Sequence, residues 1–273
     1  MAKNLTFNLK KRLKAGERLF GTLIGWGNEP EPTVEALKDL GFDMLILDME
    51  HSLIDKREVI GYLRAAKKAG IPLLLRPEEN YSHFRAYLDA GIEGLILPHV
   101  DTVEQAVYGL NQTYYPPLGH RGLGISASPY LVDPKDIAKV PLLGLTEYIN
   151  NNTMLFPQTE SRQSISNLRH ILELEGITGT WVGAYDLAYD MGAIDSKALM
   201  TEALNSEAVA EKLREVVRIC RETGKVAGIG GFSPRGCARW AKEGYQLFSI
   251  GYVTDGKVDK VKPLIDEARA LIK

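Results

Sequence analysis

The sequence lacks the features that mark several large classes of protein. Its two cysteines, Cys220 and Cys237, sit in segments with helical periodicity and without the spacing of metal ligands, so we expect buried, reduced thiols. No apolar run approaches the roughly 20 residues of a membrane-spanning helix, and the amino-terminal residues lack the apolar core of a signal peptide. We therefore expect a cytoplasmic protein without a membrane partner.

The charge balance excludes further partners. A net charge of -2 provides no basic surface for nucleic acid, and small neutral or anionic metabolites are the favoured ligands. The apolar fraction of 45% and the charged fraction of 25% are ordinary for a soluble globular protein. At 273 residues the chain is long enough for one large core, so we expect one domain over residues 1–273.

A strand followed by a helix recurs eight times along the chain, after a basic opening helix at about 8–15. The expected strands are 19–25, 43–48, 71–76, 94–100, 154–158, 179–183, 226–230 and 246–251. The expected helices are 32–40, 55–68, 83–90 (capped by Ser82), 102–110, 162–173, 208–223, 234–243 and 258–272. This alternation predicts an α/β protein with a parallel sheet that closes into a (β/α)8 TIM barrel. The alternative, a doubly wound open sheet, is expected to have a glycine-rich phosphate turn after an early strand, and none is present.

Two stretches interrupt this rhythm. Residues 114–124 are too rich in proline and glycine for a regular element, and clean apolar periodicity returns only at Met154. A second insertion separates the expected strand 179–183 from the helix that begins at about 208. Long loops within a compact domain are usually functional or disordered, and the aromatic and arginine content of the first favours an ordered loop between units four and five.

Polar residues follow the predicted strands at their carboxyl ends, where ligands bind in such folds. We expect Glu50, His51 and Arg76 to lie near one another, because they end neighbouring strands; the alternative is that they are ordinary solvated loop residues. The other strand ends contribute Asp48, His99, Gln158, Glu160, Tyr185, Asp186, Tyr252 and Asp255.

These residue types suggest a metal-assisted reaction. Glu160 and Asp186, beside Gln158, form an oxygen-rich corner suited to Mg²⁺ or Mn²⁺, although helix caps or loop acids would give the same spacing. His51 is a candidate general base or metal ligand, and the guanidinium of Arg76 suits a carboxylate or a developing enolate oxygen. For His99, in Leu-Pro-His-Val, a packed histidine is the favoured interpretation.

The chain resembles the HpcH/HpaI aldolase and citrate lyase β-subunit family from about Leu19 to Val253. The similarity is to its class II pyruvate aldolases, the 2,4-dihydroxyhept-2-enedioate aldolase group. Each motif is weak alone, but the ordered set is specific: Asp48-Met49-Glu50-His51, Leu75-Arg76-Pro77, Leu88-Asp89-Ala90-Gly91, Leu97-Pro98-His99-Val100, Tyr115-Pro116-Pro117-Leu118-Gly119-His120-Arg121-Gly122, Gln158-Thr159-Glu160-Ser161-Arg162 and Val182-Gly183-Ala184-Tyr185-Asp186-Leu187.

The resemblance implies a metal-dependent (β/α)8 barrel that forms a homo-oligomer, a hexamer or trimer. Such enzymes cleave a 4-hydroxy-2-oxo acid to pyruvate and an aldehyde through an enolate. The implied cofactor is a divalent ion, Mg²⁺ or Mn²⁺, with Co²⁺ or Zn²⁺ as further options. Its implied protein ligands are Glu160 and Asp186.

The resemblance also implies the roles of the remaining site residues. Gln158 would contact the pyruvate portion, His51 would be the general base, and Arg76 would bind substrate and stabilise the enolate. Asp89 would raise the basicity of His51, a role that rests on the resemblance alone, because the sequence pattern by itself indicates only a helix-end acid.

The chain departs from the family pattern near the expected substrate pocket. It has Gly183-Ala184-Tyr185-Asp186 where the family usually has Gly-Pro-Ala-Asp, so we predict that Tyr185 changes the pocket, narrows it or points elsewhere. Pro157 also interrupts the apolar strand before Gln158, and residues 124–130 replace the family's usual stretch after Arg-Gly. The identity of the aldehyde therefore cannot be carried over.

Two other functions remain open. One is the same enolate chemistry on another substrate, such as a citramalyl-type thioester or a phosphoenolpyruvate-derived enolate. The sequence has no basic cluster for the phosphates of coenzyme A, which disfavours the thioester. The other is a non-catalytic barrel that binds a keto acid, and an assay of metal-dependent pyruvate enolisation would separate it from both enzymes.

Overall fold

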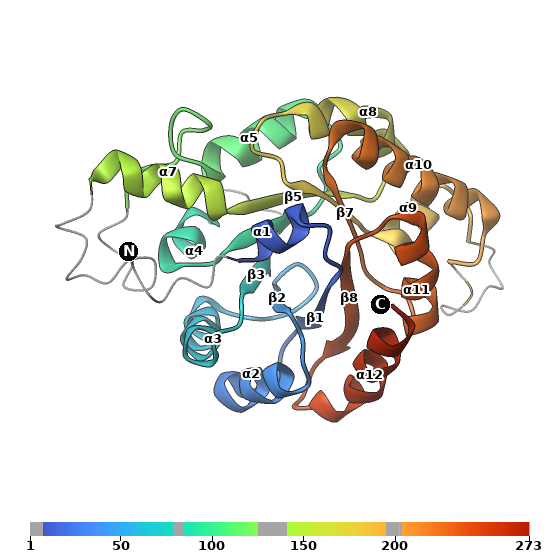
Figure 1. Ribbon diagram of the computed structural model, residues 1–273, viewed down its shortest axis with the longest axis horizontal. Helices are drawn as coiled ribbons and strands as arrows, with labels where there is room; N and C mark the ends of the chain where they lie inside the picture. Colours follow the sequence, from blue (N-terminus) through green and yellow to red (C-terminus); the bar gives the residue numbers. More distant parts are fainter. Residues whose placement is uncertain (1–7, 79–83, 125–140, 195–201, 203, 273) are drawn as a thin grey trace.

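Eight parallel strands form a closed barrel in the computed structural model, in the order β1 to β8 (Figure 1). The structure describes residues 8–78, 84–124, 141–194, 202 and 204–272. Each strand pairs in parallel with the next, and β8 pairs with β1. The strands are β1 (Leu19–Ile24), β2 (Met44–Asp48), β3 (Leu73–Arg76), β4 (Gly94–Leu97), β5 (Met154–Thr159), β6 (Gly179–Val182), β7 (Val226–Ile229) and β8 (Leu247–Val253). The predicted (β/α)8 barrel is thereby confirmed, and the open sheet is excluded.

Helices lie around the outside of the barrel and connect successive strands (Figure 1). They are α2 (Pro30–Asp39), α3 (Lys56–Ala69), α4 (Phe84–Ala90), α5 (Val103–Thr113), α7 (Leu142–Asn152), α8 (Arg162–Glu173), α9 (Ala184–Asp190), α10 (Glu207–Thr223), α11 (Pro234–Glu243), the 3-10 turn η3 (Val258–Lys260) and α12 (Lys262–Leu271). Local sequence explains their ends. Asp55 caps α3 through the amides of Arg57 and Glu58, and Gly70 ends it in the left-handed conformation.

The alternation of side chains along each strand divides the core in two. On β2, Leu45 and Leu47 face outward and pack under the helices, whereas Met44 and Ile46 face the barrel interior. Other strands alternate in the same way, so the interior core contains Leu74, Ile96, Phe156 and Trp181. Continuing this alternation to the carboxyl ends directs Asp48, Arg76, Gln158 and Glu160 inward, above the apolar layers.

The opening helix α1 (Leu9–Lys14) closes the amino end of the barrel. Leu9 and Leu13 pack into the interior core, and Leu13 accepts a hydrogen bond at its carbonyl from the side chain of Gln246. Lys10 donates from Nζ to the carbonyl of Thr153, the residue before β5, at 3.0 Å. Because α1 covers the amino end, the barrel is open to a ligand at the carboxyl ends of its strands.

The structure differs from the predictions in the two insertions. Residues 142–152, predicted to lack regular structure, form α7, in which Leu145 and Ile149 are buried. The polar run at the end of this helix weakens its apolar periodicity. Pro141 provides no side-chain cap, so the sequence also lacks a start signal for the helix. In the second insertion, α9 begins at Ala184, directly after β6 and with Gly183 as its N-cap residue. Ser82 and His83, predicted to begin the fourth helix, and residues 125–130 of the first insertion lie outside the described residues.

Other boundaries move by a few residues. β4 ends at Leu97 because Pro98 follows, three residues before its predicted end. β8 continues to Val253, and the last predicted helix is split into η3 and α12, with Pro263 in the first turn of α12.

Two expectations from composition can also be checked. Cys220 and Cys237 are free and buried, and burial raises the pKa of each thiol to about 12. Within the described parts of the chain, none of the helices has both the length and the apolar character needed to cross a bilayer.

Candidate active site

A buried ion pair between β2 and β3 organises the carboxyl end of the barrel. Asp48 and Arg76 are partners in the parallel register, so their inward-facing side chains meet. Arg76 donates from Nε to Asp48 Oδ1 at 2.9 Å and from Nη2 to Asp48 Oδ2 at 2.7 Å. This bidentate pair fixes the plane of the guanidinium.

Asp48 also accepts hydrogen bonds from three other groups. The hydroxyl of Tyr252, on β8, donates to Oδ2 at 2.9 Å, and the amides of Glu50 and His51 donate to Oδ1 at 3.1 and 3.4 Å. Burial opposes ionisation of Asp48, but the bonds from Arg76 and Tyr252 outweigh it and lower its pKa. The carboxylate therefore stays ionised and holds both Arg76 and the turn that carries Glu50 and His51.

Glu50 and His51 lie in the turn that Asp48 holds, and both are near the ion pair of Asp48 and Arg76, as predicted. Arg76 Nε lies 3.2 Å from Glu50 Oε2, and His51 Nε2 lies 3.6 Å from the same oxygen. Burial and the nearby carboxylate of Glu160 raise the pKa of Glu50, although the charge of Arg76 acts in the opposite direction. The imidazole of His51 is 57% exposed, which leaves it open to a bound substrate.

A second cluster joins Glu50 to residues from β4 and β5. The carboxylate of Glu160 is buried just after β5, where Oε1 accepts a hydrogen bond from the amide of His99 at 2.6 Å. The ring of His99 lies between two carboxylates, with Nδ1 3.3 Å from Glu160 Oε1 and Nε2 3.5 Å from Glu50 Oε1. One ligand atom from each of Glu50, His99 and Glu160 falls within 4.8 Å of the others. These three residues have the geometry of a cation-binding group.

The position of His99 corrects the interpretation of it as a packed histidine. Its side chain is half exposed and faces Glu50 and Glu160 instead of the apolar core. The backbone at His99 has a φ of 52°, a conformation that few residues other than glycine adopt. Because β4 ends at Leu97, Pro98 and His99 turn away from the strand direction, and simple alternation could not indicate where the ring points.

Gln158 lies on β5 beside Glu160, where it was predicted. Its amide nitrogen donates to Glu160 Oε2, while its oxygen Oε1 is buried and has no hydrogen-bond partner among the described residues. Glu50 Oε2 is likewise buried without a hydrogen-bond partner in the described chain. Glu50 Oε2 still has the charge of Arg76 at 3.2 Å. Buried polar atoms are usually satisfied, so Gln158 Oε1 is the candidate to face a ligand or an ion.

Asp186 occupies the first turn of α9, and Gly183, the N-cap residue of that helix, lies against the carboxylate of Glu160. A Cβ atom on Gly183 would lie 2.7 Å from Glu160 Oε2 and 3.2 Å from Gln158 Nε2, so glycine is what allows the β6–α9 turn to approach Glu160 so closely. Asp186 itself is exposed and does not belong to the group formed by Glu50, His99 and Glu160. Glu160 therefore belongs both to the predicted pair of metal ligands, Glu160 and Asp186, and to the observed group of Glu50, His99 and Glu160.

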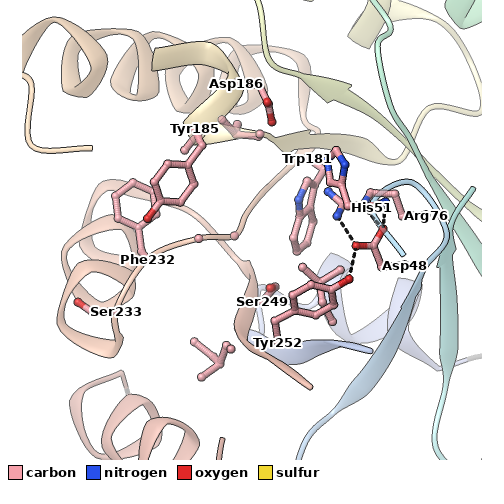
Figure 2. A pocket seen from close by; sticks show the side chains of 18 of the residues that line it. Asp48, His51, Arg76, Trp181, Tyr185, Asp186, Phe232, Ser233, Ser249 and Tyr252 are labelled. Carbon is pink, nitrogen blue, oxygen red and sulfur yellow. Dashed lines mark hydrogen bonds and ion pairs between the residues drawn. The ribbon is translucent and has the colours of Figure 1, made fainter. Parts of the chain in front are cut away.

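A cavity of about 570 Å³ opens beside the ion pair, and Arg76, His51 and Asp186 line it (Figure 2). Glu50 lines a second hollow of about 630 Å³, which His51 also borders. Tyr185 lines the first cavity, and Figure 2 shows its ring directed toward Phe232, away from Arg76. The packing of the Tyr185 ring agrees with this direction, because the ring lies against Gly231: a Cβ atom on Gly231 would be 2.9 Å from it.

Asp89 lies away from these groups within one chain. It is in the last turn of α4, which leads to the amino end of β4, whereas His51 follows the carboxyl end of β2. Arg121 binds it instead, from Nη2 to Oδ1 at 2.7 Å and from Nε to the same oxygen at 3.1 Å. No contact joins Asp89 to His51 in the part of the chain that the structure describes.

Trp181 was missed as a site candidate at this cavity, and the contact that Tyr252 makes was not anticipated. Trp181 projects inward from β6 and lines the cavity, which the tryptophan-valine sequence at a strand end could have suggested. Tyr252 was recognised as a strand-end residue, but its bond to Asp48 crosses from β8 to β2. Only barrel closure brings those strands together, so local sequence carries no signal for this contact.

The fold and the site together define a (β/α)8 barrel with an immobilised arginine beside a carboxylate-rich corner that has the geometry to hold a metal ion. This class of site suits small anionic substrates whose reactions develop negative charge on oxygen.

The profile of the HpcH/HpaI aldolase/citrate lyase family matches residues 27–257, and the chain belongs to this family. It is 30% identical to the 2-keto-3-deoxy-L-rhamnonate aldolase of Escherichia coli O17:K52:H18, over 92% of this chain and 88% of that one. The hydroxypyruvate/pyruvate aldolase of Deinococcus radiodurans is 29% identical, over 92% and 85% of the two chains. The solved structure of an HpcH/HpaI aldolase from Desulfitobacterium hafniense DCB-2 has a TM-score of 0.79 and 26% identity, with coverage of 97% and 96%.

Proposed function

We propose that this protein is a divalent-metal-dependent aldolase that cleaves a 4-hydroxy-2-oxo acid to pyruvate, or a related 2-keto acid, and an aldehyde. The observation that carries the proposal is the pairing of a fixed Arg76 with Glu50, whose carboxylate also lies beside Glu160. Relatives of the chain that are named as aldolases of 2-keto acids support the same reaction.

Arg76 is suited to bind the substrate and to stabilise the enolate. Two of its nitrogens are committed to Asp48, so the guanidinium does not have to reorganise when negative charge develops on the keto oxygen. Its burial strengthens that interaction, because water screens it less than it would a surface arginine. Gln158, whose Oε1 lacks a hydrogen-bond partner among the described residues, is suited to orient the pyruvate portion.

The donor set fits a divalent ion. Glu160 and Asp186 would hold it, and the buried oxygen Oε1 of Gln158, which has no hydrogen-bond partner among the described residues and lies beside Glu160, supports a cation at this corner. When bound, such an ion supplies Lewis-acid polarisation of the keto group. The carboxylates suit Mg²⁺ or Mn²⁺, and Co²⁺ or Zn²⁺ are also compatible with the residues present.

His51 would take the proton of the 4-hydroxyl group as the C3–C4 bond breaks. Its exposed ring at the border of both hollows supports this role. Asp89 could polarise His51 only from a second copy of the chain, since the two lie toward opposite ends of the strands in one copy. We therefore propose a cytoplasmic homo-oligomer, a hexamer or a trimer, in which Asp89 approaches the His51 of a neighbour.

The direct test measures pyruvate released from a panel of 4-hydroxy-2-oxo acids that differ in the aldehyde portion. Protein treated with a chelator should be inactive, and Mn²⁺ or Mg²⁺ should restore release. Glu160→Gln should not respond to either ion, whereas the exposed, matched variant Glu267→Gln should behave as the wild type. Release that is unaffected by chelation would contradict the proposal.

A further inference from the structure

The ring of His99 is the one nitrogen donor in the group formed by Glu50, His99 and Glu160. Both of its ring nitrogens approach carboxylate oxygens, one on Glu160 at 3.3 Å and one on Glu50 at 3.5 Å. His51, the other histidine nearby, does not belong to this group. A cation held by these carboxylates would therefore have an imidazole within reach.

The backbone supports a functional reason for this position. His99 has a φ of 52°, and non-glycine residues in that region tend to cluster at functional sites. Its amide donates to Glu160 Oε1 at 2.6 Å, so the unusual conformation fixes the carboxylate as well as the ring. Both groups are thereby oriented toward the same point before any ligand arrives.

Charge and unsatisfied atoms indicate independently that a cation belongs here. Asp48, Glu50 and Glu160 are buried carboxylates, and Arg76 is the one guanidinium bonded to them among the described residues. Arg76 pairs with Glu50 Oε2 at 3.2 Å, whereas Glu50 Oε1 faces the ring of His99. Beside Glu160, the buried oxygen Oε1 of Gln158 has no hydrogen-bond partner in the described chain. Uncompensated buried carboxylates are costly unless they are paired or coordinate a metal ion.

We propose that His99 is a further protein ligand of the divalent ion that Glu160 holds, and that it makes the site prefer Co²⁺ or Zn²⁺ over Mg²⁺. This inference rests on the proposed metal dependence and specifies the ion that the site selects. Mg²⁺ prefers an all-oxygen shell with several waters, whereas imidazole suits first-row transition ions. Replacing one oxygen ligand by nitrogen therefore favours Co²⁺ and Zn²⁺ over Mg²⁺, and we expect the affinity for Mn²⁺ to be intermediate.

The test compares metal binding by His99→Asn with the wild type, using calorimetric titrations of chelator-treated protein with Co²⁺, Zn²⁺, Mn²⁺ and Mg²⁺. Asparagine tolerates positive φ and keeps the amide that binds Glu160, so the backbone should be preserved. We expect affinity for Co²⁺ and Zn²⁺ to fall at least about 10–100-fold, the usual cost of losing even an indirect partner of a metal, while that for Mg²⁺ changes little. His170→Asn, on the exposed face of α8, is the matched control.

Pulsed electron paramagnetic resonance of the Mn²⁺-loaded protein gives a second readout that needs no turnover. We expect nitrogen coupling in the wild type and in His51→Asn, and its loss in His99→Asn. Persistence of that coupling in His99→Asn, or equal weakening of Co²⁺ and Mg²⁺ binding, would overturn the inference. If the wild type binds none of the ions, the proposed metal-dependent function fails as well. If wild type and His99→Asn bind all of them equally, only the inference about His99 fails.

Discussion

Replacing Arg76 by lysine tests whether this residue acts on the enolate or only anchors the substrate. In the wild type, Nε and Nη2 of Arg76 are held by Asp48 at 2.9 and 2.7 Å, so the guanidinium plane is fixed in a buried site. Lysine keeps the positive charge but has a single ammonium, which cannot form the bidentate pair and also present an oriented donor to the substrate.

The expected magnitude follows from this geometry. Losing one preorganised donor to a developing oxyanion typically costs a factor of about 10²–10³ in turnover, or roughly 2.7–4 kcal/mol. An interaction made mainly in the transition state lowers kcat, whereas uniform binding raises KM alone. We therefore expect Arg76→Lys to lose about two to three orders of magnitude in kcat with a smaller change in KM.

Steady-state kinetics of pyruvate release measures both constants. Arg235→Lys, in an exposed ion pair with Glu267, is the control and should match the wild type. Arg76→Ala is the less informative variant, because it strips Asp48 of its buried partner and should cost about 3–5 kcal/mol of stability. A folded Arg76→Lys protein with normal kcat and only a raised KM would refute a role on the enolate.

Three other predictions test the surroundings of the site. Gly183→Ala should weaken metal binding in a folded protein, because the added Cβ would lie 2.7 Å from Glu160 Oε2; unchanged affinity in a metal titration would contradict this close approach. Asp48 has a lowered folded pKa, so its stabilising contribution is present above its ordinary value of 3.8 and is lost as the pH falls through the folded value. Urea unfolding at a series of acidic pH values should therefore show a shallower loss of stability for Asp48→Asn than for the wild type, and parallel curves would rule this out. Cys220 and Cys237, with pKa values raised to about 12, should resist a thiol reagent at pH 8 until the protein is unfolded, and rapid labelling of the native protein would argue against their burial.

The sequence predicted the barrel because the information is local and repeated. Apolar runs of strand length, each followed by an amphipathic helix, recur eight times, and closure follows from that count. Asp48 and Arg76 were recognisable as strand-end residues because each follows directly on an apolar run of strand length. The cluster of Glu50 and Arg76 followed from the adjacency of these strands.

The remaining features depend on contacts that sequence position does not reveal. The ring of His99 is directed by a turn after Pro98 with positive φ, which alternation along β4 could not anticipate. Tyr252 reaches Asp48 only because β8 closes onto β1. Helix α7 was missed because its periodicity is weak next to a proline- and glycine-rich loop.

Deuterium exchange of the methyl group of pyruvate, followed by nuclear magnetic resonance in D₂O, tests the central claim most directly. It requires only that the protein form the enolate of pyruvate, and it does not depend on knowing the aldehyde. We expect exchange in the wild type with added Mn²⁺, none after chelation, and strongly reduced exchange in Arg76→Lys. Binding of pyruvate without exchange in the presence of Mn²⁺ and the other divalent ions would contradict the account and would indicate a barrel that binds a keto acid without acting on it.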